Sequence, residues 1–254
     1  MPGPVQAIER AAAILRLLAR GSGRLGVGEI AASLDLAKGT AHGILRTLHG
    51  VGFVEQEAAT GKYQLGAALL HLGTSYLDVN ELRSRAINWA DALAARSGEA
   101  VRIGTPLEGN VLVVHHVFRP DDTLQTLDVG ALLPLHATAL GKVLLAYDAD
   151  LAATAQRSEL ASLTRRTVVN TTALTRALAQ VREQGWAAEA EEFMPGEAGI
   201  AAPIRSYGGL VVGAIGITGA VERLCDGRLR PRSELVTHVR NAARAVSRDL
   251  GAGR

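Results

Sequence analysis

The sequence has a single cysteine, Cys225, and only three lysines, Lys38, Lys62 and Lys142, among its 254 residues. One cysteine excludes an internal disulfide and any metal site built from several thiolates. No apolar run is long enough to span a bilayer, and Glu9 interrupts the N-terminal segment where a signal peptide needs an apolar stretch. We therefore expect a cytoplasmic protein that makes no membrane contact.

A large excess of charge is also missing, because the formal net charge is only +2. A protein that coats nucleic acid needs a strong positive excess, so any DNA binding must come from a small, focused basic patch. Hydrophobic residues make up 48% and charged residues 20% of the chain, which is typical of a globular protein. The length allows one large domain or two modest ones.

Common catalytic signatures do not occur. The segment GGLVVGAIGITG does not form GxGxxG, Gly141-Lys142 lacks the flanking residues of a phosphate-binding loop, and there is no GxSxG. Cys225 is either a structural residue or a nucleophilic or redox thiol without a resolving partner. We predict no catalytic residue and no cofactor. The alternative is a small-molecule enzyme whose N-terminal helices only mediate association.

The N-terminal region shows helical periodicity in residues 5–20, 27–34 and 38–48, followed by an alternating pattern on both sides of an Ala-Thr-Gly turn. Three helices and a hairpin predict a winged helix-turn-helix domain over residues 4–66. The alternative is a small helical dimerisation domain with a solvated polar face. The predicted apolar stripes are Val5, Ile8, Ala12, Leu15 and Leu18 in the first helix, and Ala41, Ile44, Leu45 and Leu48 in the third.

The polar face of the third helix suits a DNA groove. Its small residues let the backbone approach the duplex, Arg46 can donate to guanine or phosphate, and a helix N-terminus favours a phosphate. Lys62 falls at the tip or descending edge of the hairpin, where a cation meets the duplex backbone. The predicted DNA-binding residues are Lys38, Gly39, Thr40, His42, Arg46 and Lys62.

The rest of the chain mixes strands with helices joined by tight turns, which predicts an α+β fold with a mainly antiparallel sheet. We expect a linker helix over residues 67–80 and a second domain over residues 81–251. His115 and His116 are neighbours in a predicted strand and point to opposite faces, so they cannot jointly chelate one ion. One of them could join His136 and an acid from residues 189–192, but we predict no metal site.

Several segments together resemble the IclR family of transcription regulators, in the order that the family has them. They are IAASLDLAKGTAHGILRTLHGVGFVEQ, GKYQLG, LPLHATALGKVLLA, EAEE with GIAAPI, and GAIGITGAV. Within the family the chain is most similar to regulators of glycerol operons, through segments such as VHHVFRPDD and ITGAVERL. The resemblance implies an N-terminal winged helix, a C-terminal effector domain with a GAF-like sheet, and a homodimer or dimer of dimers. It also implies that operator DNA is bound and that transcription is repressed or activated in response to a small polar metabolite, with glycerol or glycerol 3-phosphate as the candidates.

The resemblance also places an effector pocket in the C-terminal domain. Carried over position by position, the pocket residues are Ala139, Leu140, Gly141, Glu189, Gly199, Gly216 and Thr218. Gly199 and Gly216 stand where relatives carry cysteine and serine, so we expect fewer polar contacts and a roomier pocket. Gly43 stands where many relatives carry an arginine, which removes one DNA contact. An effector domain that has lost its ligand and serves only as a dimer scaffold is a further alternative.

Overall fold

The computed structural model describes residues 5–19, 24–69, 77–121 and 125–251. The chain divides into two compact units, Met1–Leu77 and Asp78–Arg254. Within the described residues, no helix combines the length and the apolar character that crossing a membrane requires.

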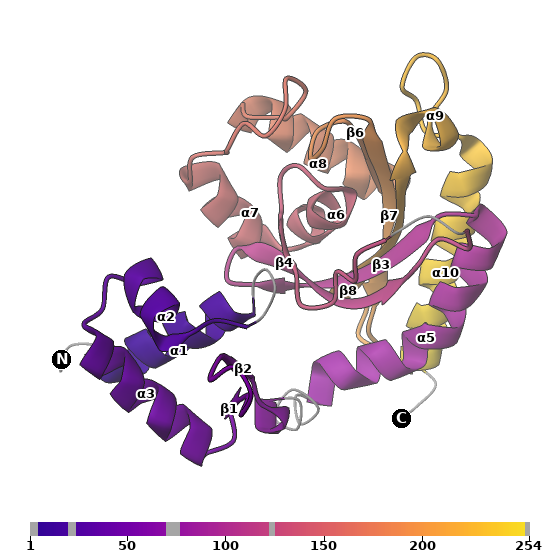
Figure 1. Cartoon of the computed structure of the whole chain (residues 1–254). Helices are drawn as coiled ribbons and strands as arrows, with labels where there is room; N and C mark the ends of the chain where they lie inside the picture. Colours follow the sequence, from indigo (N-terminus) through magenta and orange to yellow (C-terminus); the bar gives the residue numbers. More distant parts are fainter. Residues whose placement is uncertain (1–4, 20–23, 70–76, 122–124, 252–254) are drawn as a thin grey trace. The chain divides into compact units, whose positions relative to one another are not determined.

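The first unit is a winged helix-turn-helix, as the sequence predicted (Figure 1). Its apolar core joins all three helices to the hairpin through side chains such as Ile14, Ile30, Leu45 and Val54. The elements are α1 (Gln6–Leu18), α2 (Val27–Ser33), α3 (Lys38–Gly50), β1 (Val54–Gln56) and β2 (Tyr63–Leu65), with the two strands antiparallel.

The predicted stripe of α1 was wrong at its N-terminal end. Val5 is 60% exposed and Ile8 is 68% exposed, whereas Ile14 and Leu18 are buried. The first helix carries alanine and leucine around much of its circumference, so its sequence allows more than one buried face. The stripe of α3 was predicted correctly at Ala41, Leu45 and Leu48, which are buried; Ile44 is partly buried.

The region predicted as a linker helix over residues 67–80 is only partly described. Residues 67–69 are helical, residues 70–76 lie outside the described part of the chain, and α5 (Leu77–Ser97) begins before the predicted boundary at residue 81. A single helix therefore runs from the end of the predicted linker into the second unit.

The second unit contains a six-stranded sheet in the order β5-β4-β3-β8-β7-β6, and every neighbouring pair is antiparallel. One face packs against α5 and α10, and the other against α6 and α8 (Figure 1). The strands are β3 (Ala100–Leu107), β4 (Asn110–Val117), β5 (Leu132–Pro134), β6 (Ala187–Ala190), β7 (Glu197–Arg205) and β8 (Val211–Ala220). The helices are α6 (Ala139–Tyr147), α7 (Ala149–Arg157), α8 (Thr171–Gln184), α9 (Val221–Leu224) and α10 (Ser233–Gly251).

The sheet confirms the predicted α+β class, with helices on both faces of an antiparallel sheet. The sequence did not identify β5, β6, α7 or α9, which are all short elements of three to nine residues. The segment AAEA of β6 carries no β-branched or aromatic residue and becomes a strand through its pairing with β7.

Candidate DNA-binding surface and effector cavity

The helix α3 presents the predicted polar residues to solvent. Lys38, Gly39, His42 and Arg46 are exposed, Thr40 is partly exposed, and Ala41, Leu45 and Leu48 hold the opposite face in the core. Ala37 precedes the helix without a side-chain cap, so the first amides of α3 are not occupied by a capping group. Gly39 and Gly43 have open space where a Cβ would lie, which leaves room for another molecule's backbone to come close.

The hairpin holds Lys62 directly before β2, and the side chain is 44% exposed. Its ammonium lies 3.8 Å from a carboxylate oxygen of Glu29 on α2, whose other contact at 2.6 Å is the amide of Gly26. An exposed ion pair of this length contributes little free energy, so Lys62 can exchange Glu29 for a phosphate. Arg24, which the sequence did not single out, is engaged with Glu57 at 2.9 Å.

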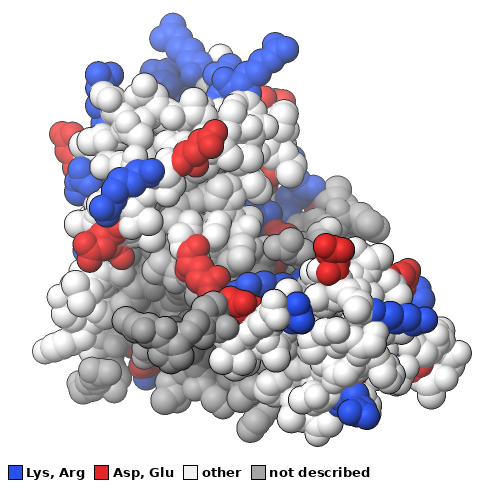
Figure 2. Space-filling view, turned by 90° about the vertical axis from the view of Figure 1, so that its left-hand side faces the viewer, with Lys and Arg blue, Asp and Glu red and all other residues white. Residues whose placement is uncertain are grey.

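Figure 2 shows charged side chains of both signs among uncharged ones, with basic side chains gathered at the upper edge of the view. The net charge of +2 gives the chain as a whole little general attraction for a polyanion.

The strand register brings the predicted pocket residues of the second unit together. Glu189 on β6 pairs with Gly199 on β7, and Gly199 pairs with Thr218 on β8. A small cavity lies against these strands and the start of α6. It is lined by Arg102, Leu133, Thr138, Ala139, Leu140, Glu189, Phe193, Gly199, Ile200, Ala201, Gly216, Ile217 and Thr218.

The cavity is small in the described structure. The cavity has a volume of about 20 Å³, which is room for roughly one water molecule. A Cβ on Gly199 would lie 3.3 Å from Glu189 Oε1 and 3.4 Å from the Cβ of Ala139, so this glycine does face the cavity. A Cβ on Gly216 would lie 2.6 Å from the carbonyl oxygen of Ile200, so Gly216 is needed for close approach to β7 rather than for pocket space.

Gly141 is the one predicted pocket residue that does not line this cavity. A Cβ there would lie 2.2 Å from the carbonyl oxygen of Leu135, so only glycine fits between α6 and the preceding loop. Its amide donates to Thr138 Oγ1 at 3.1 Å, which caps the helix. The amides of Ala139 and Leu140, which do border the cavity, have no acceptor among the described residues.

Glu189 brings to the cavity a carboxyl group whose pKa is raised. It is 6% exposed, and burial raises its pKa to about 7, although the amide of Glu192 donates to Oε2 at 2.9 Å. The nearby Glu192 carboxylate also raises the pKa, and Lys142 opposes it. Close to neutral pH this side chain can therefore either donate or accept a hydrogen bond.

Arg102 lies at the opposite end of the cavity and was missed by sequence reasoning. Its guanidinium donates to Thr218 Oγ1 at 3.3 Å and pairs with Asp128 at 2.5 Å. Arg102 and Thr218 also border a neighbouring hollow of about 570 Å³, so they stand where the small cavity meets the larger one. The sequence feature that could have identified Arg102 is its position as a charged residue within the otherwise apolar strand segment VRIG.

The other residues considered as functional candidates, a lysine, the cysteine and two histidines, are held in contacts that stabilise the fold. The Lys142 ammonium is buried and lies 2.5 Å from Glu192 Oε1. Cys225 lies in the core, where burial raises the pKa of its thiol and keeps it protonated. His116 Nδ1 accepts the amide of Asp128 at 3.1 Å, and His136 Nε2 lies 2.9 Å from the carbonyl oxygen of Ala161. Within the described part of the chain, no three His, Cys, Asp or Glu side chains lie together as metal ligands would.

A winged helix with an exposed, cationic third helix, followed by a separate α+β unit with a small cavity bordered by Glu189, Thr218 and Arg102, is typical of a helix-turn-helix transcription regulator with an effector domain. Comparison with known proteins narrows this class. Residues 7–58 match the IclR helix-turn-helix domain, and residues 74–248 match the bacterial transcriptional regulator IclR C-terminal domain. The chain belongs to the IclR family of bacterial transcriptional regulators.

Relatives of known name cover the full length of the chain. It is 59% identical to the glycerol operon regulatory protein of Streptomyces coelicolor and 57% identical to that of Streptomyces griseus, over 98% of each chain in both comparisons. The crystal structure of an IclR transcriptional regulator from Alicyclobacillus acidocaldarius superposes with a TM-score of 0.83 at 26% identity, covering 98% of this chain and 100% of that one.

Proposed function

We propose that this protein regulates a glycerol operon by binding operator DNA through α3 and the hairpin, in response to glycerol or glycerol 3-phosphate bound in the effector domain. The observation that carries the proposal is the 59% identity, over nearly the whole of both chains, to a glycerol operon regulatory protein. The family's function as transcriptional regulators favours this reading over an enzyme.

The proposed DNA contacts divide by chemistry. In the proposed complex Arg46, an exposed residue in the middle of α3, contacts a base edge, while Lys38 and the uncapped amides at the start of α3 contact a phosphate. Gly39, Thr40 and His42 complete the contact face, and Lys62 reaches the duplex backbone from the hairpin. With a net charge of +2, few contacts must be repeated by symmetry, so we infer that a homodimer or a dimer of dimers binds the operator.

Arg46→Ala should weaken operator binding by about 1–3 kcal/mol per half-site and relax specificity at one position. Lys62→Ala should instead weaken binding on all sequences and flatten the log–log salt dependence by about 0.9 per lost phosphate contact. The matched control is Arg176→Ala, which removes an exposed arginine from α8 in the other unit. Fluorescence anisotropy with promoter DNA of a glycerol operon, over a salt series, measures both effects. Unchanged binding in both variants would show that DNA contacts a different surface.

For the effector we propose the cavity between Glu189 and Arg102. Glu189 and Thr218 exchange hydrogen bonds with hydroxyl groups, and the free amides of Ala139 and Leu140 receive an oxygen atom at the start of α6. Gly199 contributes by leaving space beside Glu189. Gly216 and Gly141 contribute by allowing neighbouring backbone segments to come close. Because the cavity is only about 20 Å³, the bound state requires side chains around it to move toward the neighbouring hollow.

Gly199→Ser should weaken the effector at least tenfold, because its side chain would occupy the space between Glu189 and Ala139. The variant should still fold, since its nearest contacts are a flexible carboxylate and a methyl group at 3.3–3.4 Å. Gly219→Ser is unsuitable as a control because its Cβ would meet Glu99 at 2.1 Å, so Gly208→Ser, with open space around it, serves instead. Calorimetric titration with glycerol and with glycerol 3-phosphate gives the comparison. Equal affinities in wild type and Gly199→Ser would show that the effector does not bind in this cavity.

The whole proposal is tested by titrating the protein–promoter complex with the two candidate effectors. We expect specific binding to glycerol-operon promoter DNA and release, or tightening, when one effector is added. Binding no tighter than to scrambled DNA would overturn the assignment to a glycerol operon.

A further inference from the structure

A further hollow of the effector domain lies between α10 and the end of β7. Its volume is about 630 Å³, within the range of small-molecule sites. It is lined by Tyr147, Gly185, Ala202, Pro203, Arg205, Arg240, Asn241, Ala243, Arg244, Ser247 and Arg248. We call it the arginine groove, because four of these residues are arginines and none is acidic.

The groove forms along β7 beyond Ala201, which pairs with Ala187 at the start of β6. Strand β6 pairs only with residues 198–201, so the following residues of β7 have no described strand on that side. This edge is closed locally, because Pro203 has no N–H and the amide of Arg205 donates to Ser247 Oγ at 2.9 Å. The groove therefore does not suit the pairing of an additional strand with β7, and a ligand there would be bound by the side chains.

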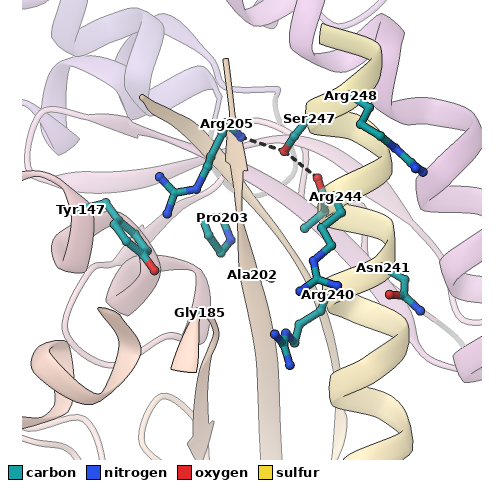
Figure 3. Close-up of a pocket in the computed structure, with 11 residues that line it drawn as sticks. Tyr147, Gly185, Ala202, Pro203, Arg205, Arg240, Asn241, Arg244, Ser247 and Arg248 are labelled. Carbon is teal, nitrogen blue, oxygen red and sulfur yellow. Dashed lines mark hydrogen bonds between the residues drawn. The ribbon is translucent and has the colours of Figure 1, made fainter. Parts of the chain in front are cut away.

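The four arginines come from two elements and line one hollow. Arg240, Arg244 and Arg248 repeat every four residues along α10, and Arg205 comes from β7 with its guanidinium 4.5 Å from the ring centre of Tyr147. Figure 3 shows Arg205 extending on one side of the strand and Arg240 and Arg244 on the other, while Arg248 turns away. Arg205 and Arg240 are half-buried, which separates them from ordinary surface arginines.

No carboxylate neutralises this cluster within the described residues. Arg205 donates to the carbonyl oxygen of Gly209 at 2.9 Å, and none of the four arginines pairs with an acid. Asp249, the acid closest in sequence, instead accepts the indole N–H of Trp89 at 2.7 Å. Like charges spaced four residues apart repel one another along a helix, so an anion in the groove would stabilise it.

The 570 Å³ hollow beside the cavity differs from the arginine groove in the pairing of its arginines. It also contains three arginines, but Arg102 pairs with Asp128, Arg119 with Asp121, and Arg223 with Glu99. Its cations are already compensated, whereas those of the arginine groove are not. Guanidinium groups bind phosphate oxygens through paired hydrogen bonds, and three cations from two elements exceed what one negative charge needs.

We propose that the arginine groove binds a small phosphorylated metabolite with two or more negative charges, at a site separate from the effector cavity. The hollow shape of the groove and the partial burial of Arg205 and Arg240 favour a small ligand over a DNA backbone, because a DNA backbone is contacted by exposed side chains. Binding there would bridge α10 and β7 and so stabilise the effector domain in response to a second metabolic signal.

The test uses pyrophosphate as the probe and the full-length protein in calorimetry at low salt. Wild type should bind with a Kd below about 1 mM, and Arg240→Gln/Arg244→Gln should lower the affinity at least tenfold. Arg176→Gln/Arg228→Gln is the matched control: it removes the same charge from exposed positions outside the groove and should leave binding unchanged. The groove variant should fold, because it relieves like-charge repulsion, and far-ultraviolet circular dichroism checks this.

The proposal would be overturned if the wild type did not bind pyrophosphate. It would also be overturned if the groove variant and the control variant bound pyrophosphate with equal affinity. A groove variant that keeps pyrophosphate affinity but loses promoter affinity or changes oligomeric state in sedimentation would overturn it as well, since the groove would then be a DNA or subunit interface. Gly199→Ser should bind pyrophosphate normally, so failure of the proposed effector cavity would not be mistaken for failure of this site.

Discussion

Replacing Lys142 with methionine should lower the free energy of unfolding of the effector domain by about 3–5 kcal/mol, because it leaves a buried carboxylate without its counter-charge. Lys142 is 4% exposed, and its ammonium lies 2.5 Å from Glu192 Oε1 and 3.4 Å from the carbonyl oxygen of Ala188. The other oxygen of Glu192 is buried and has no hydrogen-bond partner among the described residues, so Lys142 is the side chain that compensates this charge there.

Urea unfolding followed by tryptophan fluorescence measures the loss, since Trp89 and Trp186 are the two tryptophans of the chain and both lie in the second unit. Lys142→Met/Glu192→Leu should recover most of the stability, because an apolar pair of similar volume removes the uncompensated charge. Lys62→Met, at an exposed lysine of the first unit, is the control and should leave this transition unchanged. A loss below about 1 kcal/mol in Lys142→Met would show that the ion pair does not hold α6 to the loop after β6.

Glu189 should make the effector domain less stable as the pH rises from mildly acidic to neutral. Its pKa is about 7 in the folded protein and about 4.5 without burial, so between these values the folded state keeps a proton that the unfolded state has lost. Stability contributed by this proton is full below about pH 4.5 and falls through the window up to about pH 7, by about 3 kcal/mol in total. Above that range the contribution is constant.

The measurement is the difference in unfolding free energy between wild type and Glu189→Gln at pH 5 through 8. The glutamine carbonyl oxygen can still accept the amide of Glu192, so the variant should lose the pH dependence while keeping the contact. Relative to wild type, it should gain stability as the pH rises. Glu183→Gln, at an exposed position of α8, should run parallel to wild type. Parallel curves for Glu189→Gln and wild type would mean that Glu189 is ionised throughout this range.

The same titration bears on effector recognition. A protonated Glu189 donates to a ligand oxygen, whereas an ionised one only accepts from a hydroxyl group. A polyol can satisfy either form, because each hydroxyl both donates and accepts. An anionic group at the same position would be repelled once Glu189 is ionised, so we expect any phosphate of the proposed ligand to lie toward Arg102, at the other end of the cavity.

The N-terminal domain could be predicted from the sequence because its signals are local. The three-and-four spacing of Ala41, Leu45 and Leu48 fixes the buried face of α3 and, with it, the exposed positions of His42 and Arg46. The alternating residues around the turn near Thr60 likewise identify the hairpin. In α1 the local pattern allowed two faces, and the choice came from packing against the rest of the winged-helix core, which buries Ile14 and Leu18 and exposes Ile8.

The sites of the effector domain depend on pairings that no local pattern contains. Glu189, Gly199 and Thr218 are neighbours because β6, β7 and β8 pair in one register, and Arg102 joins them because β3 lies beside β8. Only the packed structure shows that Gly141 and Gly216 are required by backbone approaches of 2.2–2.6 Å, and that the cavity is nearly filled. The sequence by itself thus determined which face of α3 is exposed, since a helix's exposed face follows from its period. The tertiary structure alone decided which distant charges form pairs and which, as in the arginine groove, have no acidic partner among the described residues, because burial and strand order set those contacts.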